Sequence, residues 1–153
     1  MKLSDYFDQS LIISDLDCAD KDTVLKKFAA CVHQRFPELE AEEIYHILKE
    51  REDLGSTGIG EGIAIPHGKM KNLSTIIAAF ARSKDGVPFD SIDEQPVKFF
   101  FLLLAAENSA SLHLKALAKI SRMLKNTSFR DQLAMAEGAS GIYQVISAED
   151  ERL

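Results

Sequence analysis

With 153 residues, of which 46% are hydrophobic, the chain can bury one substantial core but is too short for two ordinary domains, so residues 1–153 are predicted to form a single domain. Its formal net charge is −6 at pH 7 and its basic residues are not clustered. Nucleic acid or an anionic membrane is therefore not expected as a partner, because both require concentrated positive charge. The N-terminus has no apolar signal segment and no stretch approaches bilayer length, so we expect a cytoplasmic protein without direct membrane insertion. Small molecules or proteins remain as partners.

Two amphipathic helices are predicted in the first third of the chain. Asp20 can cap a helix over residues 22–35, whose apolar residues form one stripe. A second helix is expected over residues 41–53, with acidic residues in its first turn and apolar residues on its inner face. Arg51 extends that apolar row.

A glycine-dense loop and a very short apolar strand follow the second helix and lead to His67. Pro66 fixes its own φ and disfavours helical geometry at Ile65, so the chain should enter His67 extended and leave through the conformational freedom of Gly68. A structural turn and a functional loop both remain open at this stage. A nucleotide site is not expected, because the loop follows a helix and lacks a Gly-Lys-Ser/Thr ending.

The second half of the chain alternates between strand and helix patterns. A strand is expected over residues 73–82, a turn at 84–86, and a second strand over 97–105 that is apolar enough to be covered on both faces. The remaining segments are predicted to be helical: one helix beginning at 108–111 and ending near 125, and two shorter ones around 129–136 and 141–146.

His67 is the best candidate for a reactive side chain. An unperturbed histidine has a pKa near ~6.5, so much of it is neutral and nucleophilic at pH 7, and its phosphoramidate is labile enough to pass a phosphoryl group on. Such a site needs backbone N–H donors and a cation but no covalent cofactor, and none is predicted. No metal site is predicted either, because no pair among the four histidines has the spacing of a strong metal motif.

Arg51 and His113 are the candidate partners of that histidine. An arginine at an inward helical position is costly unless it meets an anion, although fraying of the helix end could instead turn Arg51 to solvent. His113 lies near the start of its helix, where free N–H groups and the helix dipole attract negative charge. On spacing alone, however, its place in the apolar row of Leu117, Ile120 and Leu124 favours a buried core histidine. His33 and His46 are interpreted as structural or exposed.

Several of these segments together carry a family resemblance, over nearly the whole chain. The chain resembles the enzyme IIA domains of the fructose–mannitol class in the bacterial phosphoenolpyruvate phosphotransferase system (PTS). The resemblance is carried by Arg51, the glycine-rich loop, Gly62-Ile63-Ala64-Ile65-Pro66-His67-Gly68, and Leu112-His113-Leu114 with Leu117. It implies an α/β fold with a mixed β-sheet flanked by helices in one compact domain.

The resemblance also implies roles for these residues. His67 would be the phosphoryl acceptor, His113 the second active-site histidine and Arg51 the phosphate-stabilising arginine. The donor would be a small HPr-like phosphocarrier, so the partners would be proteins. The loop residues expected to support the phosphoryl group are Ser56, Thr57, Gly58, Gly60, Gly62 and Gly68, and those expected to contact a partner through an exposed apolar surface are Ile59 and Ile63.

Within this family the chain is most similar to the nitrogen-related IIA proteins, since no IIB, IIC or HPr segment is attached and residues 56–60 match their loop. Those proteins are regulators that report a phosphorylation state. Two alternatives stay open: a sugar-specific IIA component that passes the phosphoryl group to a IIB domain, and an interaction module that is not phosphorylated. Glu61 departs from the asparagine common at its position in this family, and it would put a carboxylate near the phosphorylated site.

Overall fold

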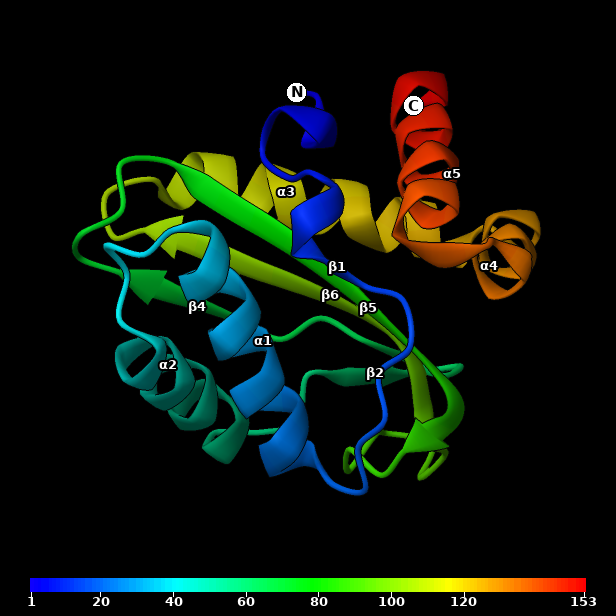
Figure 1. Ribbon diagram of the computed structural model, residues 1–153, viewed down its shortest axis with the longest axis horizontal. Helices are drawn as coiled ribbons and strands as arrows, with labels where there is room; N and C mark the ends of the chain where they lie inside the picture. The colour runs from blue at the N-terminus through cyan, green and yellow to red at the C-terminus, as the bar shows by residue number, and fades with distance from the viewer.

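A mixed six-stranded sheet forms the centre of the structure, a computed structural model that describes residues 1–153 (Figure 1). The neighbouring strands follow the order β1-β5-β6-β3-β2, and β4 also pairs with β6. The two longest strands, β5 and β6, are antiparallel, whereas β3 and β4 both run parallel to β6. The strand bounds are β1 Ile12–Ile13, β2 Gly58–Gly60, β3 Ile63–Ala64, β4 His67–Met70, β5 Ile76–Val87 and β6 Val97–Ala106.

Helices cover both faces of this sheet. In Figure 1, α1 and α2 lie in front of the long strands and α3 passes behind them. The helices are α1 Lys21–Arg35, α2 Ala41–Asp53, α3 Ala110–Lys125, α4 Thr127–Met135 and α5 Gly138–Arg152, and two short 3₁₀ turns precede them, η1 Leu3–Asp5 and η2 Gln9–Leu11. This arrangement confirms the predicted fold class. None of the five helices has the length and apolar character needed to cross a membrane.

The core lies where the predicted patterns put it. Asp20 caps α1 by accepting a hydrogen bond from the backbone N–H of Thr23 at 2.8 Å. Strand β6 is buried continuously from Phe100 to Ala106, as expected of a strand covered on both faces. An edge-to-face contact between Phe28 of α1 and Phe100 of β6 ties the front helices to the sheet.

Element ends differ from the sequence prediction at several places. Strand β5 continues through the segment predicted as a turn at 84–86, because a register shift between Arg82 and Val87 and a positive φ of 83° at Gly86 absorb the turn as a bulge within the strand. It begins at Ile76, later than predicted. Helix α5 extends well beyond the predicted 141–146. Strand β1 and the two 3₁₀ turns were not predicted, since they are too short to show a period.

Strands β3 and β4 lie end to end along β6 and are separated by Ile65 and Pro66. Pro66 has no N–H to donate, but its carbonyl accepts a hydrogen bond from the N–H of Leu103 at 3.0 Å, so pairing with β6 continues past the gap. His67 therefore starts a new strand opposite Leu103. The expectation that Gly68 provides conformational freedom was wrong. A Cβ at position 68 would overlap Cγ2 of Ile47 in α2, so glycine is required for space.

The two ends of the chain meet beside α3. The carboxylate of Asp150 in α5 accepts hydrogen bonds from the backbone N–H groups of Leu3 and Ser4, each at 3.0 Å. It also forms an ion pair of 2.5 Å with Lys119 of α3. Lys2 lies 3.3 Å from Glu151 at the surface. Asp150 thereby joins the N-terminal segment, α3 and α5.

Candidate functional site

The imidazole of His67 is held by a carbonyl two residues before it. Nδ1 lies 2.8 Å from the carbonyl oxygen of Ile65. A carbonyl oxygen only accepts hydrogen bonds, so Nδ1 must carry the proton, and in the neutral ring Nε2 is left with a free lone pair. The extended geometry that Pro66 imposes on Ile65 makes this contact. The ring is half-buried.

Arg51 reaches the same ring from the last turn of α2. Its Nε donates to Nε2 of His67 at 3.3 Å, which is consistent with a lone pair on that nitrogen. Its Nη1 donates to the carbonyl of Gly55 at 2.7 Å, in the turn that follows the helix. The side chain therefore does not turn away to solvent, and its charge lies beside Nε2 of His67.

His113, in the first turns of α3, lies beside His67. The two ring centroids are 5.5 Å apart and the rings meet edge to face at 75°. His113 is only 6% exposed, and its Nε2 is buried without a hydrogen-bond partner in the protein. It is thus both a buried histidine, as its apolar row indicated, and a neighbour of the candidate nucleophile, as the resemblance implied.

Burial shifts both histidines toward their neutral forms. The pKa of His67 is lowered, chiefly because burial disfavours the imidazolium and also because of the positive charge of Arg51, while the contact with Ile65 opposes the shift. The pKa of His113 is lowered by burial first and then by the proximity of His67. Neutral imidazole is the nucleophilic form, so the lowered pKa of His67 favours the form that a phosphoryl acceptor would need.

The residues predicted to form a supporting loop lie in a segment that follows α2 but do not form a single turn: Ser56 and Thr57 precede β2, Gly58 and Gly60 lie in β2, and Gly62 lies in the turn between β2 and β3. The hydroxyl of Ser56 donates to the carbonyl of Phe89 at 2.5 Å and accepts from the N–H of Gly58 at 3.0 Å. Gly58 packs so closely on Ser91 that a Cβ would overlap the hydroxyl. Gly60 and Gly62 have φ values of 96° and 78°, which favour glycine. Gly68, in β4, belongs to the strand that begins with His67 instead of to this loop.

The two residues predicted as exposed contacts have different environments. Ile59 is 48% exposed, in β2, and can meet a partner. Ile63 is 2% exposed, because it pairs with Phe99 in the sheet and belongs to the core. The prediction of Ile63 as an exposed contact was therefore wrong. Leu54 and Leu114 were not predicted as exposed contacts, yet their side chains are 85% and 68% exposed. They follow Arg51 and His113 closely in the chain.

Glu61 holds an unusual backbone position and points toward α4. Its φ is 58°, and its N–H donates to Oδ2 of Asp93 at 2.9 Å. Its carboxylate lies 3.6 Å from Nη1 of Arg130. The remaining histidines lie outside the site, as predicted: Nδ1 of His33 bonds the carbonyl of Leu39 at 2.6 Å, and His46 is exposed on α2.

The sequence also matches a known family. The model of the EIIA 2 family of the phosphoenolpyruvate-dependent sugar phosphotransferase system matches residues 5–149. The chain belongs to this family. The proteins to which it is similar include nitrogen regulatory proteins and fructose-specific components of the phosphotransferase system.

A nitrogen regulatory protein of Bradyrhizobium diazoefficiens is 37% identical over 147 residues, which cover 96% of this chain and 95% of that protein. The fructose-specific EIIABC component of Bacillus subtilis is 32% identical over 151 residues, or 99% of this chain but 24% of that longer protein. Among solved structures, the nitrogen regulatory protein IIA-Ntr of Neisseria meningitidis superposes with a TM-score of 0.87 at 29% identity. That superposition covers 94% of this chain and 98% of the other.

Proposed function

We propose that this protein is a nitrogen-regulatory member of the family, which accepts a phosphoryl group on Nε2 of His67 from an HPr-like phosphocarrier in the cytoplasm. The observation that carries the proposal is the hydrogen bond from Nδ1 of His67 to Ile65, which directs the lone pair to the nitrogen beside Arg51. A buried, neutral imidazole next to a fixed guanidinium is suited to accept a transferable anion.

The chemistry requires little movement. The Nε2 lone pair of His67 attacks the phosphorus of the carrier's phosphohistidine, the new N–P bond forms as the carrier's N–P bond breaks, and the electron pair of the broken bond returns to the carrier's ring. The proton on Nδ1 stays in its bond with Ile65. Arg51 exchanges its contact with Nε2 for the phosphoryl oxygens, and His113, whose ring lies beside that of His67, offers a ring N–H. Both stabilise charge that the reaction brings to the site.

The regulatory role rests on two similar proteins named as nitrogen regulatory proteins, which the match covers to 95% and 98% of their lengths. Phosphorylation adds up to about two negative charges at a surface where Ile59, Leu54 and Leu114 are exposed. A target protein that docks on apolar side chains there would bind one phosphorylation state better than the other. The partners are therefore a phosphocarrier and a regulatory target.

The direct test is phosphorylation in a purified system. Incubation with phosphoenolpyruvate, enzyme I and an HPr-like carrier should add one acid-labile phosphoryl group, and His67→Ala should abolish it because no other ring has a directed lone pair beside a cation. His46→Ala, on the exposed face of α2, is the matched control and should be phosphorylated normally. Intact-mass spectrometry measures both. Full phosphorylation of His67→Ala would reject the site.

A sugar-transport role is the second candidate, favoured by 32% identity to a fructose-specific component over 99% of this chain. Both roles use the same chemistry and differ in where the group goes next. We expect the phosphorylated protein to return its group to the carrier but to transfer it poorly to a fructose- or mannitol-type IIB domain. Rapid transfer to IIB followed by sugar phosphorylation would establish transport instead. A protein that is never phosphorylated by the carrier would be an interaction module.

A further inference from the structure

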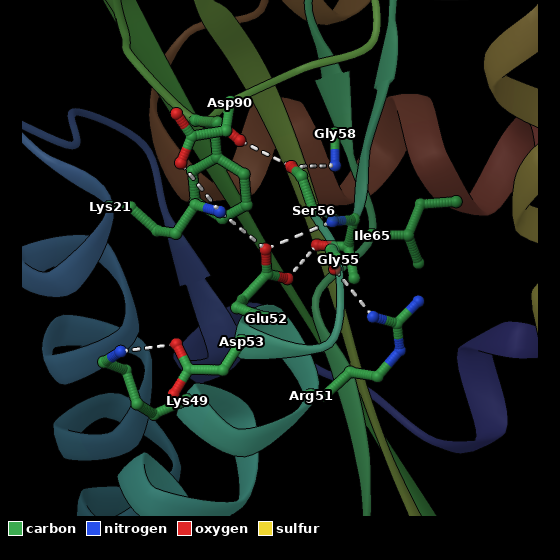
Figure 2. Close-up of polar contacts among 12 residues, drawn as sticks. Lys21, Lys49, Arg51, Glu52, Asp53, Gly55, Ser56, Gly58, Ile65 and Asp90 are labelled. Atoms are coloured by element: carbon green, nitrogen blue, oxygen red, sulfur yellow. Dashed lines mark hydrogen bonds and ion pairs between the residues drawn. The ribbon is translucent and has the colours of Figure 1, made fainter.

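Glu52 follows Arg51 in α2 but turns its side chain into the protein, away from the guanidinium (Figure 2). Its side chain is only 2% exposed, and Nζ of Lys21 lies 3.1 Å from its Oε1. The carboxylate accepts one hydrogen bond from the N–H of Thr57 at 3.1 Å and another from the Thr57 hydroxyl. Burying a carboxylate without such partners costs free energy. The Glu52 carboxylate therefore stays bound to Thr57, in the turn that follows α2.

Thr57 connects this carboxylate to the imidazole through two further hydrogen bonds. The carbonyl of Thr57 accepts from the N–H of Ile65 at 3.1 Å, and the carbonyl of Ile65 accepts from Nδ1 of His67 at 2.8 Å. The link is positional, since each bond fixes the backbone that makes the next one. Glu52 thereby holds the strand segment that orients His67.

The same turn also fixes Arg51. Gly55, between Glu52 and Thr57, accepts from Nη1 of Arg51 at 2.7 Å. The contacts of the His67 ring with the Ile65 carbonyl and with the Arg51 guanidinium therefore both depend on the turn over residues 52–57. Glu52 closes this turn through its hydrogen bonds with Thr57.

Lys21 connects Glu52 to a second loop, which contains Phe89 and Asp90. Besides Glu52, its Nζ lies 3.4 Å from Asp90 and 4.8 Å from the ring centroid of Phe89 (Figure 2). That loop is itself bonded to the turn, since Ser56 donates to the Phe89 carbonyl. The Lys21 side chain is 20% exposed, so this ion pair is less screened by salt than a surface pair. Lys21, the first residue of α1, thus contacts both the end of α2 and the loop of Phe89 and Asp90, and stabilises their relative position.

We infer that Glu52 is a positioning residue for phosphoryl transfer, holding the turn so that Ile65 keeps His67 in its Nδ1–H tautomer and Arg51 stays beside Nε2. The inference rests on the proposed function. Glu52 touches no reacting atom. Without its carboxylate, the turn gains freedom, the neutral ring can carry its proton on either nitrogen, and Nε2 is the free nucleophile in only part of the molecules. Loss of alignment of about 1 Å can slow a reaction by roughly 10²-fold.

The test compares Glu52→Ala with Asp53→Asn. Asp53 is the next residue and also an acid paired with a lysine, Lys49 at 2.6 Å, but its side chain is 60% exposed and has no bond to the turn. Long-range ¹H–¹⁵N NMR reads the two ring nitrogens of His67 in the neutral state. We expect wild type and Asp53→Asn to show a protonated Nδ1 and a free Nε2. Glu52→Ala should show averaged shifts from mixed tautomers, with transfer from the carrier slower by about tenfold to a hundredfold.

Two milder variants answer the question if Glu52→Ala does not fold. Thr57→Val removes only the hydroxyl bond, and Glu52→Gln removes the charge that Lys21 neutralises; each should shift the tautomer balance and slow transfer in the same direction. Folded variants with a lowered melting temperature but wild-type ring shifts and transfer rates would overturn the inference and leave Glu52 a purely structural residue. The NMR measurement needs no carrier. A wild-type protein that the carrier does not phosphorylate therefore rejects the proposed function, while the ring shifts still decide the role of Glu52.

Discussion

At the scale of single residues, the site consists of one imidazole whose two nitrogens have different partners. Ile65 holds the proton on Nδ1 of His67, and Arg51 faces the lone pair on Nε2. In the proposed reaction, the guanidinium would therefore contact the ring before the phosphoryl group arrives, and little reorganisation would be needed. His113 adds a buried ring nitrogen without a partner, which a phosphoryl oxygen would satisfy.

Removing the side chain of Arg51 or of His113 should slow phosphoryl transfer without unfolding the protein. Arg51→Ala and His113→Ala each remove a donor whose work is done in the transition state, at a cost of about 2.7–4 kcal/mol of barrier, or roughly 10² to 10³ in rate. Quenched-flow transfer from a phosphorylated carrier measures the rate, and circular dichroism checks the fold. Wild-type rates in both variants would mean that His67 works alone.

The lowered pKa of His67 predicts how reactivity depends on pH. Burial disfavours the imidazolium, so the pKa of His67 is lowered from its ordinary value of ~6.5. As pH falls from 8, the nucleophilic fraction of His67, and with it the capacity for transfer, should therefore decline at a lower pH than it would for an unperturbed histidine. An NMR titration of His67 against a peptide of residues 62–68 measures this shift. A protein titration at or above that of the peptide would contradict it.

At the scale of elements, the site depends on how closely α2 approaches β4. The two elements carry Arg51 and His67, and their contact passes through Ile47 and Gly68, where no Cβ fits. The helix can therefore place its last turn within reach of the first residue of the strand. The space at Gly68 sets the distance between the cation and the ring.

Gly68→Ala should separate these elements and destabilise the fold by about 1–3 kcal/mol, the usual cost of overpacking. Ile47→Ala removes the opposing Cγ2 together with the rest of the side chain beyond Cβ, so Gly68→Ala/Ile47→Ala should recover part of the loss caused by overlap, and the two changes should be non-additive. Urea unfolding of the two single variants and the double variant measures the coupling. Strict additivity would show that the contact is not the cause.

Much of this level could be predicted from the sequence. The helix over 41–53 has the predicted bounds, and the continuous apolar run of β6 is buried as expected. The errors have physical causes. Residues 84–86 were predicted as a turn because a β-bulge with a glycine at positive φ has the same sequence pattern as a turn. They form a bulge within β5 instead. Burial of Ile63 depends on pairing with a distant strand. The role of Glu52 could not be seen either, since nothing local indicates that a chain turns back onto a carboxylate.

At the scale of the whole molecule, Asp150 connects segments that are far apart in sequence. Its side chain is fully buried, and it binds two backbone N–H groups near the N-terminus and Lys119 of α3. Burial alone would raise the pKa of this carboxyl, but the bonds from Lys119, Ser4 and Leu3 outweigh burial, so its pKa is lowered.

Asp150→Ala should destabilise the protein by about 3–5 kcal/mol, because it leaves a lysine and two N–H groups without their partner. Glu151→Ala, which removes the exposed pair with Lys2, is the matched control and should cost at most about 1 kcal/mol. The folded-state pKa lies below that of the unfolded chain, so the ionic contribution is complete above pH ~4 and is lost as pH falls through the folded value. Chemical denaturation at pH 7 and pH 3 should therefore show a smaller difference at the lower pH.

The meeting of the two chain ends also makes this fold easy to combine with others. Because Lys2 and Glu151 are already in contact, a short linker could close the chain into a ring, and new ends could be opened at the exposed residues 71–72, as in a circular permutant. Neighbouring modules could be attached at either end without spreading the sheet. The fructose-specific EIIABC relative, in which the matching segment is 24% of the protein, is such a combination: one unit of this size within a longer chain.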